Sequence, residues 1–504
     1  MTRTAFLTLF LGALLGAVPA VAQDSRGDLP DIGNPASTTI SVADEFKIGR
    51  MILKQLRDSG EIVEDPEVNE YIQSVGSRIA SFAHEGAQRF TFFVVKDSAI
   101  NAFALPGGFI GVNAGLLTAT ASESELAGVL AHEIAHVTQR HIARSVQNAG
   151  RSNMASAAAV LAAILVATTT GMPPDALLGT ITAAQSLAAQ SQINFTRTNE
   201  AEADSVGMSF LANAGFDPYG MPSFFWTLQQ RSGNAGALVP ELLRTHPVTS
   251  ERIAETRSRA AQLTRPAVED STSYALVRER LRTQMLPPDT NFRDLYGDAT
   301  SADLPTGDER RYGRALALMT AGDKASLAEA TGLLKDLTDR RPDVTLYHTA
   351  LGQAQLASGD IEGSLRTLEH ALELFPRNVP VTVRYAESLM HAGEPARAHS
   401  LLLDLFNNVP PTPDQARYIA LVASAAGDTG DAYYYMSEYH VMGGELQMAI
   451  DQLRLALAVP GLNDVQRQRF QARIDELSEY LPKGRRAREV AGPASPGEPG
   501  RVAG

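Results

Sequence analysis

The chain has 504 residues, 44% of them hydrophobic and 20% charged, so it can bury a large core and is expected to form two or more domains. A formal net charge of -13 and the absence of a long basic run argue against nucleic acid as a partner. The sequence contains no cysteine, which excludes disulfide bonds, thiolate metal sites and a cysteine nucleophile.

The N-terminal segment predicts an exported protein. Arg3 is followed by an apolar stretch over residues 5–18 and by an Ala-Val-Ala cleavage site that ends at Ala22. These features are typical of a secretory signal peptide, which we assign to residues 1–22. We therefore expect cleavage near Ala22 and, for a chain without cysteine, a bacterial periplasmic location. Residues 23–40 are rich in Pro, Gly, Ser and Asp and are expected to be disordered.

Helical spacing followed by β-rich runs predicts two helices and then three strands before residue 115. The predicted helices begin at Val42 and Val68, and the predicted strands cover Phe90–Val95, Asn101–Leu105 and Phe109–Val112. The exposed edge of a sheet can bind an extended peptide as an added strand. Asn101, Ala102 and Phe103 are therefore candidate substrate-binding residues, with an ordinary sheet strand as the alternative interpretation.

The next helical pattern contains His132-Glu133-Ile134-Ala135-His136, and it begins with a predicted capping box at Ser122 and Glu125. Two imidazoles four residues apart project from the same helical face, so one metal ion can bind both. Glu133 lies beside them, where its carboxylate can deprotonate a metal-bound water. The motif predicts one Zn²⁺ per chain, with His132 and His136 as ligands and Glu133 as the catalytic base.

Catalytic zinc usually has three protein ligands, so one residue besides His132 and His136 is needed. The H-E-x-x-H-x-x-G-x-x-H pattern is excluded, because Gln139 and Ile142 stand where its glycine and last histidine would be. In an ideal helix, rotation by ~100° per residue turns His141 to the side opposite His132, which makes it a poor ligand.

A later helix, predicted to begin near Thr198, supplies carboxylates instead. Glu200 and Asp204 are four residues apart and face the same way. We assign Glu200 as the third metal ligand and Asp204 as the acceptor of a hydrogen bond from the non-ligating nitrogen of His132. Glu202 is turned away by ~200° and is predicted to be a solvated carboxylate.

Residues 154–190, between these two helices, are predicted to form an apolar helical hairpin. Its first arm, Met154–Thr170, is rich in small residues and shorter than the ~20 apolar residues that span a bilayer, so no integral membrane span is predicted. Two positions for the hairpin remain open, one over the zinc cleft and one against a membrane surface.

Residues 266–307 are predicted to be a linker with one helix near Tyr274–Gln284. Beyond this linker, prolines and glycines each recur every 34 residues, which is the period of tetratricopeptide repeats. These residues are Pro342, Pro376 and Pro410, and Gly359, Gly393 and Gly427. We predict a repeat domain over residues 308–480, whose first copy has a longer inter-helix loop, and a disordered tail over residues 481–504.

The pattern His132-Glu133-x-x-His136 with Glu200-x-x-x-Asp204, preceded by Asn101-Ala102-Phe103-Ala104-Leu105-Pro106-Gly107-Gly108, resembles the peptidase family of HtpX and the CAAX prenyl proteases. With its export signal and C-terminal repeats, the chain is similar to the BepA-like periplasmic members of that family. The resemblance implies an α+β fold. It consists of a mostly helical zincin-type metallopeptidase (gluzincin) domain with a small β-sheet over residues 41–265, followed by an all-α tetratricopeptide superhelix.

The family pattern also includes a Thr-His-Pro motif, found here as Thr245-His246-Pro247, and an arginine six residues later, Arg252. The resemblance places His246 near the metal. It implies two roles for this histidine: stabilising the oxyanion of the intermediate, or occupying the open zinc position as a fourth ligand in a latent enzyme. Arg252 carries a fixed positive charge suited to the developing negative charge on the substrate. The alternative is a helix-start turn with an ordinary ion pair.

The resemblance implies a zinc-dependent endopeptidase that cleaves misfolded or stalled exported proteins in the quality control of outer-membrane protein assembly. The repeat domain is expected to bind unfolded or misassembled polypeptide clients and to dock to the outer-membrane assembly machinery. Two alternatives stay open. One is a chaperone or assembly factor that works through its repeats and holds a latent protease site. The other is a membrane prenyl-protein protease, which the export signal and the lack of a predicted span disfavour.

Overall fold

The computed structural model describes residues 41–83, 89–148, 185–232, 240–267, 269–287, 290, 296 and 307–481. The predicted signal peptide, the segment 23–40, most of the apolar hairpin and the tail from residue 482 lie outside these described residues. Within the described ranges, no helix combines the length and the apolar character needed to cross a membrane.

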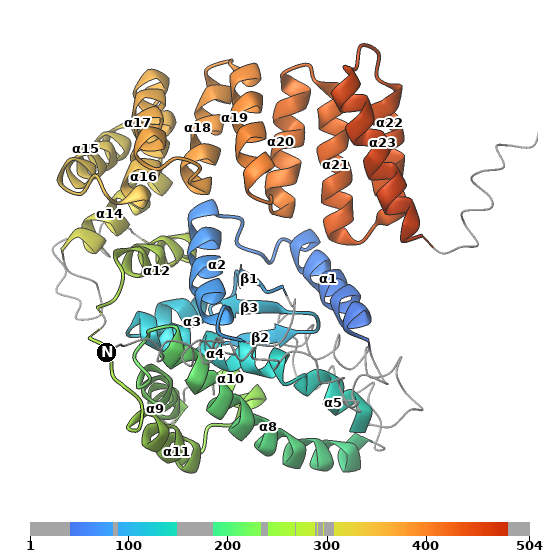
Figure 1. Ribbon diagram of the computed structural model, residues 1–504. Coiled ribbons are helices and arrows are strands. Elements are labelled where there is room, and N and C mark those ends of the chain that lie inside the picture. Colours follow the sequence, from blue (N-terminus) through green and yellow to red (C-terminus); the bar gives the residue numbers. More distant parts are fainter. Residues whose placement is uncertain are drawn as a thin grey trace, which may run out of the picture.

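The molecule has two tiers, an N-terminal domain and a helical array that lies above it in Figure 1. The N-terminal domain contains α1 (Val42–Asp58), α2 (Pro66–Ala80), β1 (Thr91–Val95), β2 (Ala102–Leu105), β3 (Phe109–Asn113), α3 (Ala114–Ala119), α4 (Glu123–Thr138), α5 (His141–Asn148), α8 (Gln185–Asn213), α9 (Gly220–Ser232), α10 (Glu241–Thr245) and α11 (Ser250–Ala260). Helix α12 (Thr272–Gln284) joins the two tiers. The array contains α14 (Asp308–Ala321), α15 (Lys324–Arg340), α16 (Thr345–Ala357), α17 (Ile361–Leu374), α18 (Val379–His391), α19 (Pro395–Asn408), α20 (Pro413–Ala425), α21 (Thr429–Gly443), α22 (Leu446–Ala458) and α23 (Asp464–Glu479).

The three predicted strands form one sheet with the order β1-β3-β2. Strand β1 pairs with β3 in parallel, from Thr91 opposite Phe109, whereas β2 pairs with β3 antiparallel, from Ala102 opposite Val112. Among the described residues, β2 therefore has a free edge. Alternate residues point to opposite faces of a strand. Phe92 and the other residues on its face pack in one core cluster with α2 and α4, whereas Phe93 and its neighbours pack with α1.

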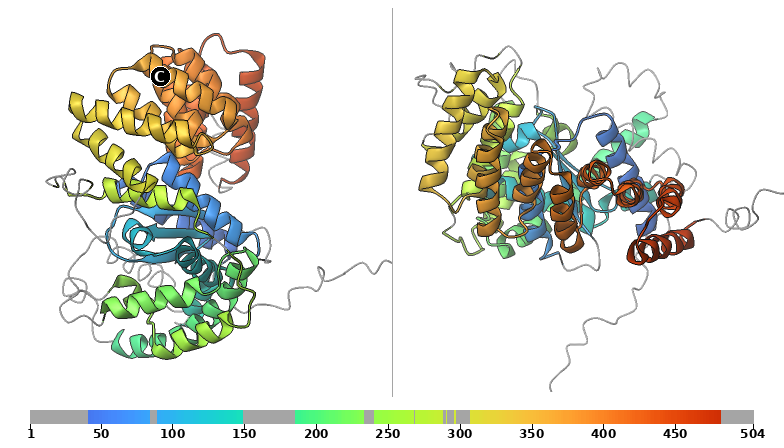
Figure 2. Two further views of the ribbon diagram at one scale, coloured as in Figure 1. Left: turned by 90° about the vertical axis from the view of Figure 1, so that its left-hand side faces the viewer. Right: turned by 90° about the horizontal axis from the view of Figure 1, so that it is seen from above.

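The helices of the array follow one another in a row, which Figure 2 shows from above. Gly359, Gly393 and Gly427 end the first helix of three successive pairs, and their φ angles of 84°, 74° and 84° are in the left-handed region that favours glycine. The predicted 34-residue period is therefore the period of the helix pairs. The prediction of a longer loop in the first repeat was wrong, because the additional residues lengthen α15 (17 residues) relative to α17 (14 residues).

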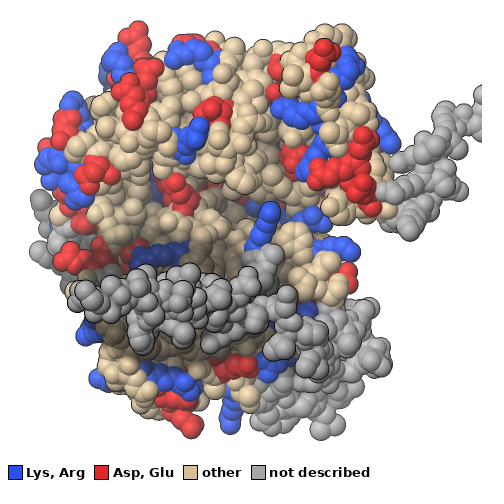
Figure 3. Space-filling model, in the orientation of Figure 1, with Lys and Arg blue, Asp and Glu red and all other residues tan. Residues whose placement is uncertain are grey.

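A single hydrophobic cluster runs from the N-terminal domain through α12 into the start of the array. Tyr274 and Leu281 of α12 are buried in it together with Tyr312 of α14 and Tyr347 of α16. The helix predicted inside the linker is thus part of the core, and it fixes the array on the domain below. On the face shown in Figure 3, acidic and basic side chains are interspersed over the array.

Candidate metal centre

Helix α4 carries the H-E-x-x-H motif through the interior of the N-terminal domain. Ser122 caps the helix by accepting a hydrogen bond from the backbone N–H of Glu125 (3.2 Å), and the Glu125 carboxylate accepts one from the N–H of Ala121 (2.7 Å). The predicted capping box is therefore present in a shifted form, because its reciprocal bond goes to Ala121. Every residue of α4 except His136 is buried, so the two imidazoles are held on a well-fixed helix.

Helix α8 lies directly against α4, and it begins at Gln185, before the predicted start near Thr198. Gly207 permits this approach, since a Cβ atom at that position would lie 2.9 Å from the carbonyl oxygen of Ala131. The contact brings the polar segment of α8 to the two histidines of α4. Glu200 and Asp204 are both buried there.

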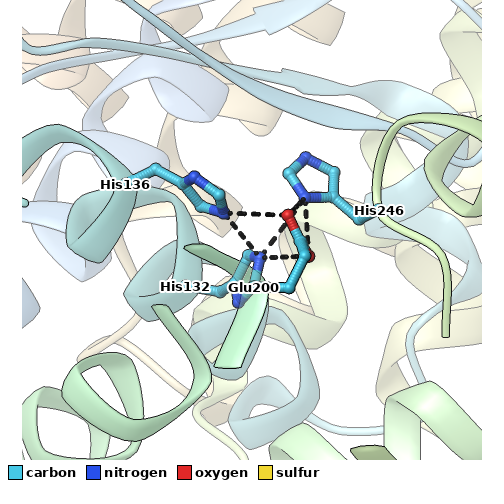
Figure 4. Close-up of side chains that lie close together, drawn as sticks. All are labelled: His132, His136, Glu200 and His246. Carbon is cyan, nitrogen blue, oxygen red and sulfur yellow. Dashed lines mark hydrogen bonds and ion pairs between the residues drawn. The ribbon is translucent and has the colours of Figure 1, made fainter. Parts of the chain in front are cut away.

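The three predicted ligands, His132, His136 and Glu200, lie close together, and His246 lies beside them (Figure 4). His132 Nε2 lies 3.0 Å from His136 Nε2 and 3.4 Å from Glu200 Oε2. His136 Nε2 lies 3.4 Å from Glu200 Oε1. His246 Nδ1 lies 2.9 Å from Glu200 Oε1 and 3.4 Å from His132 Nε2. One ligand atom from each of the four residues lies within 4.8 Å of all the others.

The geometry and charge of this cluster fit a zinc ion. A tetrahedral ion with bonds of about 2.0–2.1 Å holds its ligand atoms about 3.3 Å apart, and two imidazoles with one carboxylate are a common catalytic ligand set. Burial opposes ionisation of Glu200, yet the surrounding imidazoles hold its pKa well below the usual value. Burial also opposes charge on His132, but Asp204 and Glu200 raise its pKa to about 10. Burial lowers the pKa of His136. The carboxylates thus favour positive charge at the centre of the cluster.

Asp204 and Arg252 contact the predicted ligands on the side away from the centre of the cluster. Asp204 Oδ1 lies 3.0 Å from His132 Nδ1, the nitrogen turned away from the other ligands, and the predicted hydrogen bond between them stays a prediction. Arg252 donates to both oxygens of Asp204, from Nε and Nη2 at 2.8 Å each, and its Nη1 lies 2.9 Å from Glu200 Oε2. Its guanidinium also lies over the ring of Phe225, 4.9 Å from the centroid. These contacts direct the charge of Arg252 toward the two carboxylates.

Glu133 lies beside the ligands without joining them. Its carboxylate is 1% exposed and its Oε1 has no hydrogen-bond partner among the described residues. The nearest ion-pair contact is to His246 Nε2, at 3.6 Å. Glu133 thus lies beside the ligand cluster, where a general base must lie to reach a metal-bound water.

Comparison with known proteins identifies a peptidase family in the N-terminal domain and a repeat family in the array. The model of peptidase family M48 matches residues 66–260, and a tetratricopeptide repeat model matches residues 355–425. A putative β-barrel assembly-enhancing protease of Vibrio cholerae is 33% identical over 462 residues, which cover 91% of this chain and 94% of that protein. The β-barrel assembly-enhancing protease of Escherichia coli K12 is 31% identical over 480 residues, 94% and 96% of the two chains. The chain belongs to peptidase family M48.

A further relative matches a shorter part of the chain. The mitochondrial metalloendopeptidase OMA1 of Arabidopsis thaliana is 30% identical over 192 residues, 38% of this chain and 36% of that protein. Membership of M48 makes the chain a metallopeptidase and confirms the predicted family. It also confirms the predicted architecture of a mostly helical protease domain with a small sheet, followed by tetratricopeptide repeats. An M48 peptidase uses a metal ion, and the cluster on α4 and α8 brings together residues that could hold one.

The predicted substrate-binding residues lie on the free edge strand of this M48 domain or next to it. The side chains of Asn101 and Ala102 are buried, and the ring of Phe103 packs on Phe93 and over Gly111. A peptide could therefore pair here only with those backbone groups of the segment that are not bonded to β3, which excludes the Asn101 C=O, because it accepts from the Asn113 N–H. Whether it does so stays a prediction.

Two residues of the site were misjudged from the sequence. Helix α4 ends at Thr138, and Arg140 adopts a positive φ of 52°, so the chain turns before His141 begins α5. His141 therefore does not lie on the far side of α4, because its Nδ1 is 3.0 Å from His136 Nδ1. Glu202 is not simply solvated either, since it contacts His141 and Arg144. No glycine marks the turn at Arg140, so this geometry has little signal in the sequence.

Proposed function

We propose that this M48 peptidase is a zinc-dependent endopeptidase, with one Zn²⁺ per chain, that cleaves misassembled or stalled outer-membrane β-barrel proteins in the periplasm. The observation that carries the proposal is the convergence of His132, His136 and Glu200 beside the buried carboxylate of Glu133. The relatives of Vibrio cholerae and Escherichia coli, which are named β-barrel assembly-enhancing proteases, support the choice of substrate.

Each residue of the proposed site has its own role in peptide hydrolysis. A zinc ion held by His132, His136 and Glu200 supplies Lewis-acid chemistry to the scissile carbonyl and to a water molecule. Glu133 takes a proton from the attacking water and delivers it to the leaving amine. Asp204 fixes the orientation of His132, and Arg252 holds Asp204 and Glu200 in place through its planar fork of donors.

His246 gives the proposed enzyme a resting state. Its Nδ1 lies among the ligand atoms, and its contact with Glu200 is as short as 2.9 Å. A fourth protein ligand leaves no position for the attacking water, so the enzyme is silent while His246 is bound. This arrangement also supports the second candidate function, in which the protein acts chiefly as a chaperone or assembly factor and holds its protease in reserve.

The repeat array is proposed to bind clients and to dock to the outer-membrane assembly machinery. Tetratricopeptide arrays offer extended surfaces for polypeptides, and the array packs on the catalytic domain through a hydrophobic cluster that includes α12. A client bound to the array is therefore held next to the catalytic domain. Rescue and cleavage become two outcomes of one binding event.

The test uses the full-length mature chain and its Glu133→Gln variant. Both are expected to contain about one zinc per chain by elemental analysis. Cleavage of an unfolded outer-membrane β-barrel protein by the variant should fall by about 10²–10⁴-fold, the usual contribution of a general base. Glu255→Gln, at an exposed position of α11, is the matched control and should retain wild-type cleavage. Full cleavage by the zinc-bound Glu133→Gln variant would show that the base is assigned wrongly.

A further inference from the structure

We propose that His141 and Glu202 form a hydrogen-bond relay that orients the metal ligand His136, and that both are positioning residues of the metal centre. This inference rests on the proposed zinc peptidase function, because it concerns how that centre holds its metal. It adds to the site two residues that neither ligate the ion nor touch the substrate.

The backbone between α4 and α5 is shaped to return His141 to the metal centre. Arg140 is one of only two non-glycine residues with a positive φ in the part of the chain that the structure describes. Such a conformation is unfavourable for a residue with a side chain and persists where surrounding contacts hold it. Arg140 Nη2 donates to Glu45 of α1 at 3.1 Å, which fixes the turn from outside. As a result the rings of His141 and His136 lie 4.8 Å apart at 81°.

The ring nitrogens allow one consistent assignment of hydrogens. His136 Nε2 faces Glu200 and His132, so this nitrogen is the one that binds the metal. A ligating neutral imidazole carries its hydrogen on the other nitrogen, here Nδ1. That N–H points at Nδ1 of His141, 3.0 Å away, which must then accept. The hydrogen of His141 is therefore on Nε2, which lies 3.2 Å from Glu202 Oε2.

Glu202 is itself held in place, because Arg144 Nη1 donates to the same carboxylate oxygen at 2.9 Å. Each ligating histidine thus has a carboxylate and an arginine on the side away from the metal. His132 contacts Asp204, which Arg252 holds. His136 contacts His141, which in turn contacts Glu202, held by Arg144. Both carboxylates come from α8.

Helical geometry explains why His136 needs an intermediate residue. Glu202 and Asp204 are two positions apart, so they point to sides of α8 that differ by ~200°. Asp204 reaches His132 directly, at 3.0 Å, whereas Glu202 faces away from it. The imidazole of His141, which is buried, spans the remaining distance to His136. An ordinary buried histidine would need only the bond to Glu202, and the short contact with His136 is what points to the metal.

The test measures zinc affinity by competition with a chromophoric chelator, for the full-length protein and its variants. His141→Leu removes the acceptor and is expected to weaken zinc binding by about 10–100-fold, the usual effect of losing such a partner. His141→Asn places an amide oxygen close to the position of the lost Nδ1 and should stay within a few-fold of wild type. Glu202→Ala, at a partly exposed position, should weaken binding in the same direction, whereas Glu255→Ala should not.

Cobalt substitution and thermal unfolding of the metal-free protein complete the experiment. The absorption bands of bound Co²⁺ should change in His141→Leu and stay close to wild type in His141→Asn. The melting temperature of each metal-free variant shows whether it still folds. Equal zinc affinity in wild type, His141→Leu and Glu202→Ala would overturn the relay and leave the proposed function intact. A wild-type protein that binds no zinc would overturn the proposed function itself.

Discussion

Arg384 of α18 donates two hydrogen bonds to Glu67 of α2, from Nε to Oε1 at 3.0 Å and from Nη2 to Oε2 at 2.8 Å. The two residues are 317 positions apart, and this pair joins the repeat array to the catalytic domain. Arg280 of α12 approaches the same carboxylate at 3.2 Å. Burial opposes the charge of Glu67, but Arg280 and Arg384 hold its pKa well below the usual value. A bidentate ion pair, in which Glu67 is 1% and Arg384 11% exposed, therefore sets the position of the array.

Replacing Arg384 with methionine should loosen this junction. The substitution keeps much of the side-chain volume, but it leaves Arg280 as the only arginine that contacts the buried Glu67 carboxylate among the described residues. Removing one partner of a buried ion pair typically costs about 3–5 kcal/mol. Denaturant unfolding should therefore give a lower midpoint or a separate early transition of the array. Arg366→Met on α17, where the side chain is 71% exposed, is the control and should change stability by less than about 0.5 kcal/mol. Identical unfolding curves for the two variants would contradict the assignment.

A second contact between the tiers predicts that the stability of the fold depends on pH. Arg57 Nε of α1 lies 3.3 Å from Glu64 Oε1 and 3.1 Å from Asp414 Oδ2 of α20, so two carboxyl groups share one guanidinium. Burial and the neighbouring Asp414 raise the pKa of Glu64 from 4.5 to about 8. A group with a raised pKa binds its proton more tightly in the folded state. Its contribution to stability is complete below about pH 4.5 and is lost as the pH rises through about 8.

The Glu64→Gln variant isolates this effect, since its amide stays neutral at every pH. Urea midpoints of the wild type should fall more steeply than those of the variant between about pH 5 and pH 8. Glu362→Gln, at a side chain that is 89% exposed, should keep the wild-type slope. If wild type and Glu64→Gln show parallel profiles, Glu64 does not carry the bound proton.

The parts of this structure that local spacing determines could be predicted from the sequence. His132 and His136 share a helical face because they are four residues apart, and the same rule paired Glu200 with Asp204. The strands were found within one or two residues, because β-rich runs between turn residues are also local signals. The repeat period followed from glycines whose left-handed backbone is needed at each turn.

The rest depends on tertiary contacts that no local rule contains. His141 was placed by extending an ideal helix past Arg140, where the chain turns under a contact with Glu45 of α1. The pairing of Glu67 with Arg384 joins residues of two domains, and many other carboxylate and guanidinium pairs were equally compatible with the sequence. The orientation of Arg252 toward Asp204 and Glu200 likewise follows from the packing of α11 on α8.

The close approach of α8 to α4 makes Gly207 sensitive to substitution. In Gly207→Ala the new methyl group would meet the backbone of Ala131 and His132 at 2.9–3.0 Å, and backbone atoms cannot move aside independently. We expect a destabilisation of about 1–3 kcal/mol together with weaker zinc binding, because α8 carries Glu200. Gly332→Ala in α15 has open space around the new methyl and should instead stabilise by up to about 1 kcal/mol. Wild-type stability and zinc affinity in Gly207→Ala would show that the helices can separate without cost.

The proposed resting state predicts that removing His246 raises the rate of cleavage, whereas removing Glu133 lowers it. If His246 occupies the fourth zinc position most of the time, His246→Ala should retain zinc and cleave an unfolded substrate faster. Release of an enzyme that is active in less than a tenth of its molecules raises the rate by about tenfold or more. A histidine that stabilises the oxyanion would instead cost about 10²–10³-fold in rate when removed, so the direction of the change separates the two roles. His370→Ala, at a 62% exposed histidine of α17, is the control for the substitution itself and should leave cleavage unchanged.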